Sequence, residues 1–207
     1  MNHPFLVLQK SSVSLLLCLF AALLSSLQAV EEQPYTLIKK YGPLEIRNYP
    51  SANLAQIQVQ GESYRSILNQ GFRSLASYIF GKNQAQQKIA MTAPVIYTPA
   101  PDSASSPAHA GTMAFVMPQH LSFEALPKPD SSSIILSRTR PVTVAHLSFG
   151  GFLQFAGYRT FAKKEKELMK LLEDHRLTPR GPIQHHYYTD PFNPFPRYAI
   201  STEILPP

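Results

Sequence analysis

The sequence has one cysteine among 207 residues, and it has no long run of like charge. The cysteine, Cys18, lies in an apolar N-terminal segment. Removal of that segment would leave a chain with no disulfide, no cysteine nucleophile and no thiolate metal ligand. The net charge of +6 is mild, and the longest cluster of charges, Lys163–Glu167, is mixed in sign. This pattern is typical of a solvated helix face, so we expect no nucleic-acid partner.

Common catalytic signatures are also missing. The chain has no Gly-x-Ser-x-Gly, no His-Glu-x-x-His, no Gly-rich phosphate loop and no Cys-x-x-Cys-His for covalent haem. The adjacent His185 and His186 would point to opposite faces of a strand and could not share a metal. His146 lies in an apolar strand, where we expect a core or edge histidine with its hydrogen bonds made. His109 lies in a proline-rich loop, where we expect it to be solvated.

Residues 1–29 are typical of a signal peptide. Lys10 precedes an apolar run, Val13–Leu24, which is shorter than the roughly 20 residues that span a bilayer. Ala29 is a plausible cleavage point, and a retained N-terminal anchor is the alternative. We therefore expect a periplasmic or secreted protein with no stable membrane insertion after cleavage.

The remaining residues, 30–207, predict a single α+β domain. Apolar residues make up 44% and charged residues 15%, which excludes wholesale disorder. Helical spacing is found at Tyr64–Ile79 and from about Tyr158 to His175. The expected strands are Tyr35–Tyr41, Leu44–Tyr49, Leu54–Val59, Ile89–Thr98, Met113–Met117, Ile134–Ser137, Val142–Leu147, Ile183–Tyr188 and Tyr198–Ile204. The element order predicts two β-α-β-β halves, about 34–120 and 121–205, whose helices pack on one curved antiparallel sheet that can close into a barrel.

Two segments stand out from this pattern. Lys88-Ile-Ala-Met-Thr-Ala-Pro-Val95 fits a buried strand in which Met91 fills core space and Pro94 marks an edge or bulge. The corner from Tyr187 to Pro196 is rich in proline and aromatic residues. Such a corner serves equally well as a structural lid or as the mouth of an apolar pocket.

Several segments together resemble the SOUL haem-binding protein family. They are Tyr41-Gly-Pro-Leu-Glu-Ile-Arg-Asn-Tyr49, Gly71-Phe72-x-x-Leu75-x-x-Tyr78-Ile79-x-Gly81-Lys-Asn83, Lys88–Val95 with its Met91-Thr-Ala-Pro94, Phe115-Val-Met-Pro118, Leu126-Pro-Lys-Pro129 and Phe149-Gly-Gly. The resemblance covers Tyr35 to Leu205. It implies a distorted antiparallel β-barrel from two β-α-β-β repeats with two packed helices. It also implies a tetrapyrrole site in an apolar groove beside the first helix and a neighbouring loop.

The chain departs from that family at two places. Asn48 stands where some members have a histidine proposed as an axial ligand, and an amide is a poor ligand for iron. Arg197-Tyr-Ala-Ile-Ser201 replaces an Arg-Arg/Asn-Asn-Glu-Val segment. We therefore expect non-covalent haem binding in which axial ligation is weak or absent.

The resemblance and the helical spacing together predict the residues of the binding site. Leu68, Phe72 and Leu75 would form an apolar wall with Met91 nearby, and Arg65 or Arg73 would contact a propionate. Plain core packing is the alternative for each apolar residue. The expected function is an exported, non-enzymatic protein that binds haem or porphyrin. Two alternatives are an effector-type module for another hydrophobic small ligand and a hydrolase using the same pocket. The sequence leaves the oligomeric state open.

Overall fold

The computed structural model describes residues 30–101, 109–150, 157–188 and 195–205. The chain divides into two units, Met1–Val30 and Glu31–Pro207, and all helices and strands named below belong to the second. The predicted signal segment, 1–29, lies outside the described residues. None of the described helices has the length and apolar character needed to cross a membrane.

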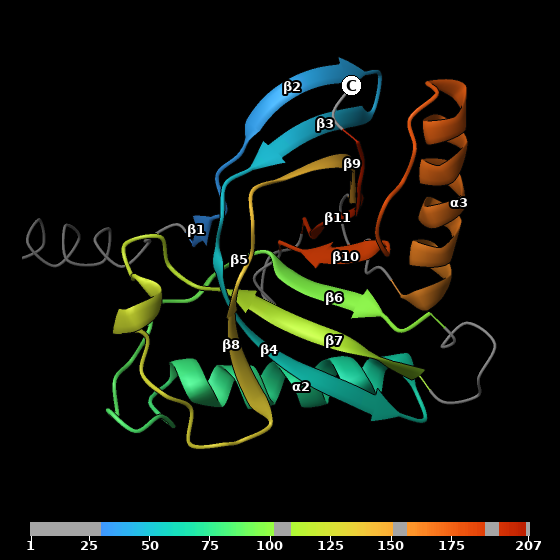
Figure 1. The fold of residues 1–207 in the computed structure, drawn as a ribbon. Helices are drawn as coiled ribbons and strands as arrows, with labels where there is room; N and C mark the ends of the chain where they lie inside the picture. Colours follow the sequence, from blue (N-terminus) through green and yellow to red (C-terminus); the bar gives the residue numbers. More distant parts are fainter. Residues whose placement is uncertain (1–29, 102–108, 151–156, 189–194, 206–207) are drawn as a thin grey trace, which may run out of the picture. The chain divides into compact units, whose positions relative to one another are not determined.

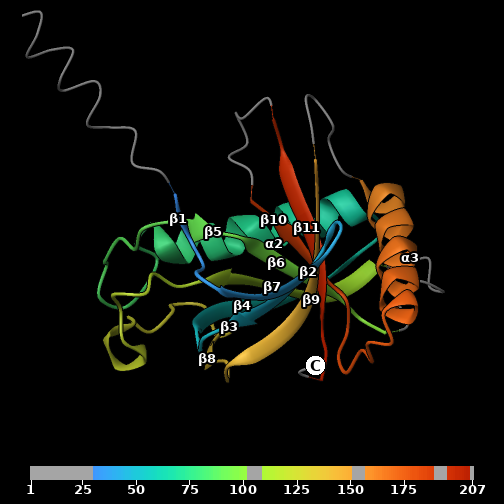
Figure 2. The ribbon, with the colours of Figure 1, turned by 90° about the horizontal axis from the view of Figure 1, so that it is seen from above.

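Nine antiparallel strands form one curved sheet (Figures 1 and 2). In order across the sheet they are β2 (Thr36–Tyr41), β3 (Leu44–Tyr49), β9 (Val142–Gly150), β11 (Arg197–Glu203), β10 (Gln184–Tyr187), β6 (Val95–Pro99), β7 (His109–Val116), β4 (Asn53–Gly61) and β8 (Ile134–Arg138). Two further strands, β1 (Glu31–Glu32) and β5 (Thr92–Ala93), pair in parallel. The two edge strands β2 and β8 do not pair with one another in the described part of the chain, so the expected curvature is present but the sheet is not closed into a barrel.

The strand order is symmetric about the central pair of β10 and β6. On one side β4 leads into a helix, α2 (Tyr64–Ile79), and then into β6 and β7; on the other, β9 leads into α3 (Tyr158–Asp174), β10 and β11. The outer strands cross over, since β3 pairs with β9 while β8 pairs with β4. The predicted α+β fold of two β-α-β-β repeats with two packed helices is thereby confirmed.

Both helices pack on the same face of the sheet, α2 against β4 and β7 and α3 against β9 and β11 (Figure 1). The Ser63 side chain caps α2 by accepting a hydrogen bond from the backbone N–H of Ser66 at 3.2 Å. The predicted bounds of α2 are confirmed. Its buried residues recur at helical spacing, and Ile67 and Leu75 are completely buried.

Two strand predictions near residue 100 were wrong in their bounds. The expected strand Ile89–Thr98 is divided at Pro94, which has no N–H for a sheet hydrogen bond and follows Ala93 through a cis peptide. Strand β7 begins at His109 rather than Met113 because the long strand β4 continues the pairing as far as Gly61. His109 is consequently a half-buried strand residue, and the prediction of a solvated loop position was wrong.

The second face of the sheet carries no described helix. Alternation along the strands directs one set of side chains into the main core beneath the helices and the other set to this helix-free face. A small separate cluster lies there, formed by buried Ile96, Ala114 and Val116 with half-buried Ala52 and Leu54 against it. The fold therefore offers two chemically distinct surfaces, the outer side of α2 and the helix-free face.

Candidate functional site

The predicted apolar wall lies along one side of α2. Leu68 and Phe72 are half-buried and pack on the main core, and the Phe72 ring lies 5.4 Å from that of Phe115. Leu75, one turn further on, is completely buried within the core. A ligand on this side of the helix can therefore touch Leu68 and Phe72, whereas Leu75 lies beneath them as packing.

Two of the other predicted site residues, Arg65 and Arg73, lie on α2 itself. Arg65 is exposed one turn before Leu68, a spacing that places both on one helix face. Arg73 is also exposed. Met91 is half-buried and packs against the same main core. We call Arg65, Leu68 and Phe72 the α2 surface.

The helix-free face holds a cavity that the sequence did not indicate. Its volume is about 310 Å³. Apolar side chains form most of its wall, among them Tyr49, Leu54, Ile96, Val142 and Val144. The polar side chains around it include Gln184, His186, Ser201, Arg140 and Glu203. An apolar wall with a few convergent polar groups is typical of small-ligand pockets.

Two buried histidines lie on this face. His186 Nε2 is 2.8 Å from Ser201 Oγ, and the His146 ring lies 5.6 Å from the His186 ring. Burial, reinforced by the neighbouring positive groups, lowers the pKa of His146 to about 2 and that of His186 to about 3. Both rings are therefore neutral at physiological pH.

His146 corrects one sequence prediction. It occupies the expected core position at 1% exposure, yet neither ring nitrogen has a hydrogen-bond partner among the described residues. The hydrogen bonds that we expected the His146 ring to make are therefore absent among the described residues. Within the described ranges, no group of three or more His, Cys, Asp or Glu side chains could hold a metal ion.

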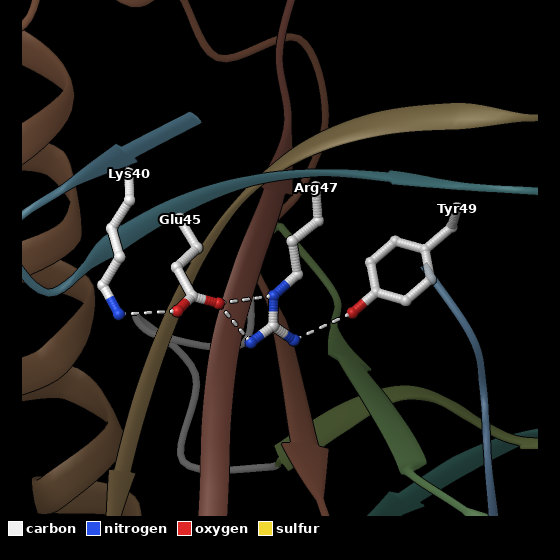
Figure 3. Close-up of polar contacts among 4 residues, drawn as sticks. All are labelled: Lys40, Glu45, Arg47 and Tyr49. Carbon is white, nitrogen blue, oxygen red and sulfur yellow. Dashed lines mark hydrogen bonds and ion pairs between the residues drawn. The ribbon is translucent and has the colours of Figure 1, made fainter. Parts of the chain in front are cut away.

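A charged network borders the same face (Figure 3). Glu45 accepts hydrogen bonds from Arg47 Nε at 2.9 Å, from Arg47 Nη2 at 2.6 Å and from Lys40 at 3.1 Å. Arg47 Nη1 also donates to Tyr49 Oη at 3.2 Å, and its guanidinium lies 4.0 Å from the Tyr35 ring centre. These contacts hold the guanidinium of Arg47, a residue that is 7% exposed.

The pKa values in this network follow its geometry. Burial acts to raise the pKa of Glu45, but the hydrogen bonds and charges of Arg47 and Lys40 outweigh it and hold that pKa below its ordinary value. Burial likewise acts to lower the pKa of Arg47, and its bonds to Tyr49 and Glu45 raise it instead. The pair is therefore fully ionised at neutral pH.

Sequence reasoning missed Glu45 and Arg47 as partners, although a signal was available. Residues two apart on a strand share a face, so Glu45-x-Arg47-x-Tyr49 places an acid, a base and a phenol in one row. The pairing of His186 with Ser201 had no such local signal. It depends on the antiparallel register of β10 and β11.

The fold places the chain in a class of α+β domains in which two helices cover one face of a curved antiparallel sheet. The C-terminal domain of EcmrR superposes with a TM-score of 0.57 at 10% identity, over 83% of this chain and 98% of that domain. A hydrolase from Listeria innocua superposes with a TM-score of 0.54 at 14% identity, over 80% of this chain and 94% of that one. At such identities the likeness concerns the fold alone.

Sequence comparison gives the family. The model of the SOUL heme-binding protein family matches residues 30–204, and the chain belongs to that family. It is 30% identical to human heme-binding protein 2 over 170 residues, which cover 80% of each chain. The mouse heme-binding protein 2 is 32% identical over 111 residues, 54% of each chain. The family is generally one of binding proteins, and both relatives are named for haem binding.

Proposed function

We propose that this protein binds haem or a related tetrapyrrole, non-covalently, on the α2 surface. The observation that carries the proposal is the row of Arg65, Leu68 and Phe72 on one side of α2, in a chain of the SOUL family. The role is binding rather than catalysis.

The residues present fit such a ligand. Leu68, Phe72 and Met91 offer partly exposed apolar surface to a flat macrocycle, whose burial is the main source of affinity. Arg65 stands one turn away as a donor for a propionate carboxylate. The only cysteine lies in the predicted signal peptide, so the bound group is held without thioether bonds.

The positions of the histidines favour weak axial ligation of the haem iron. None of the six histidines beyond residue 29 lies on α2. His146, His185 and His186 are buried beneath the surface of the sheet. From these histidine positions we infer that haem binding depends on apolar burial and on pairing of the propionates.

Titration tests this proposal. We expect haem to bind at a single site. Iron-free protoporphyrin should bind within about tenfold of haem, because ligation worth more than about 1.4 kcal/mol would separate the two affinities further. Absorbance and fluorescence quenching measure the two constants. Absence of saturable binding of either ligand would refute the proposal.

The position of the site is tested by Phe72→Asp. Burying a large apolar side chain is worth about 1.5–3 kcal/mol, so haem affinity should fall about tenfold or more. The matched control is Leu54→Asp, since Leu54 is also a half-buried apolar residue but lies on the helix-free face. Circular dichroism serves as the control that both variants fold. Unchanged affinity in folded Phe72→Asp would place the site elsewhere.

A second candidate function is binding of another hydrophobic small ligand, as in effector-type modules. The cavity of about 310 Å³ on the helix-free face favours it. This size is at the lower end for small-molecule sites, which suits a compact apolar ligand. The same two variants separate the candidates, because such a ligand would be lost in Leu54→Asp and retained in Phe72→Asp.

We also propose that the protein is exported to the periplasm or secreted. The signal-peptide pattern of residues 1–29 supports this, and the family match begins at residue 30. N-terminal sequencing of the recovered protein should begin near Val30. Chains that retain Met1 in the membrane fraction would instead indicate an anchor.

A further inference from the structure

Four side chains form a hydrogen-bonded chain beneath the two helices. Glu165 Oε1 of α3 is 2.6 Å from His185 Nε2 of β10, and His185 Nδ1 is 2.9 Å from Tyr64 Oη at the start of α2. Tyr64 Oη is in turn 2.5 Å from Tyr187 Oη of β10. Three elements of both repeats therefore meet in one polar chain, which is separate from the α2 surface and from the helix-free cavity.

One tautomer of His185 gives every hydrogen bond of this chain the same direction. An ionised carboxylate only accepts, so His185 donates to Glu165 from a proton on Nε2. In the tautomer that carries its single proton there, Nδ1 is an acceptor, and Tyr64 donates to it. Tyr64 has no second proton, so Tyr187 donates to Tyr64. All three protons point toward Glu165.

Its surroundings keep Tyr64 a neutral phenol, and the imidazole of His185 lies beside it as the proton acceptor. Tyr64 is 9% exposed, and burial together with the adjacent Tyr187 raises the pKa of its hydroxyl well above the ordinary value of 10.0. His185 is 0% exposed and stacks on Phe161 at 4.2 Å. Glu165 is the partly exposed end of the chain, with 33% of its side chain accessible.

Aromatic contacts connect Tyr64 with the protein surface. The ring of Tyr158, which is 41% exposed, lies 5.7 Å from the Tyr64 ring. The Tyr97 ring lies 5.6 Å away on another side. Ring contacts of this kind allow an electron to leave a buried phenol through an exposed one.

We propose that Tyr64 is a one-electron redox site whose oxidation is coupled to proton transfer to His185. Its oxidant is a radical of the peroxyl class. Tyr64 gives one electron to the radical through Tyr158 and gives its phenolic proton to His185 Nδ1. The peroxyl radical becomes a peroxide anion, which takes a proton from water, and Tyr64 is left as a neutral phenoxyl radical.

The carboxylate of Glu165 stabilises the imidazolium formed in this step, and the Tyr187 hydroxyl stabilises the phenoxyl oxygen by donating to it. Two other buried tyrosines lack these features. Tyr97 donates to the backbone carbonyl of Ala110 at 2.9 Å, and Tyr78 donates to that of Pro127 at 2.9 Å. A carbonyl oxygen does not take up the proton, so these phenols are matched controls inside the same core.

The experiment uses the haem-free protein, which makes it independent of the proposed haem function. Flash-generated ruthenium(III) tris(bipyridine) serves as the one-electron oxidant, and electron paramagnetic resonance measures the yield of long-lived tyrosyl radical. We expect the radical in the wild-type protein and in Tyr97→Phe, and its loss in Tyr64→Phe. Glu165→Gln should lower the yield at least about tenfold, a factor that corresponds to about 1.4 kcal/mol.

Circular dichroism serves as the control that each variant is folded, and Tyr64→Phe keeps the aromatic ring. An undiminished radical in Tyr64→Phe or in Glu165→Gln would overturn the proposal. So would a wild-type radical no longer-lived than that of free tyrosine. An equal loss in Tyr97→Phe would move the redox site to that residue and also refute the assignment.

Discussion

Acidification from pH 6.5 toward pH 3 should destabilise the folded protein steeply, because His146 and His186 are buried in their neutral form. Their pKa values are held at about 2 and about 3, whereas the histidine reference value is 6.5. Between these limits the unfolded chain binds protons that the folded chain does not. Stability is therefore fully present above pH 6.5 and is lost as the pH falls.

Each histidine should contribute about 1.4 kcal/mol per pH unit to this slope. The expected result is a free energy of unfolding that decreases through pH 6, 5 and 4, measured by urea denaturation. His146→Leu isolates one contribution. Since neither His146 nitrogen has a partner among the described residues, an apolar replacement should be neutral or stabilising at pH 7.

The His146→Leu variant should also have a shallower acid slope, by about 1.4 kcal/mol per pH unit. His120→Gln is the control for removal of a histidine, because His120 is exposed. A His146→Leu slope equal to that of the wild-type protein would show that His146 is not a source of the acid sensitivity.

Glu45→Ala should destabilise the protein by about 3 kcal/mol, because it leaves the buried Arg47 guanidinium without its carboxylate. Arg47 keeps Tyr49 and the Tyr35 ring, but neither carries a compensating charge. Chemical denaturation at pH 7 measures the loss. A loss below about 1 kcal/mol would put this ion pair in the range of an exposed one.

A double-mutant cycle separates the ion pair from the packing around it. Glu45→Ala combined with Arg47→Met should cost less than the sum of the single changes, since the double variant has no unpaired charge. Glu124→Ala is the comparison in an exposed pair, because both Glu124 and Arg138 are largely accessible. That change should leave the denaturation midpoint unaltered.

The sequence by itself determined the local elements. The apolar spacing of Tyr64–Ile79 predicted α2 at its observed bounds, since the same residues that repeat at helical intervals are those that the sheet buries. The prediction that His185 and His186 face opposite ways was confirmed for the same reason. His185 contacts Tyr64 and Glu165 on the helix side, whereas His186 contacts Ser201 on the other. The residues of the family resemblance indicated the SOUL family, which comparison of the whole chain confirmed.

The tertiary structure alone decided which of these residues meet. Tyr64 and His185 are separated by 121 positions, and Asn48 and Thr143 by 95, yet each pair is hydrogen-bonded. The hydrophobic periodicity of a segment does not predict such pairs, because they depend on strand order and on the register between the two repeats. The complete burial of Leu75 also depends on core residues distant in sequence. Hydrophobic periodicity is a property of one segment, whereas a cavity or a proton chain exists only where several segments converge.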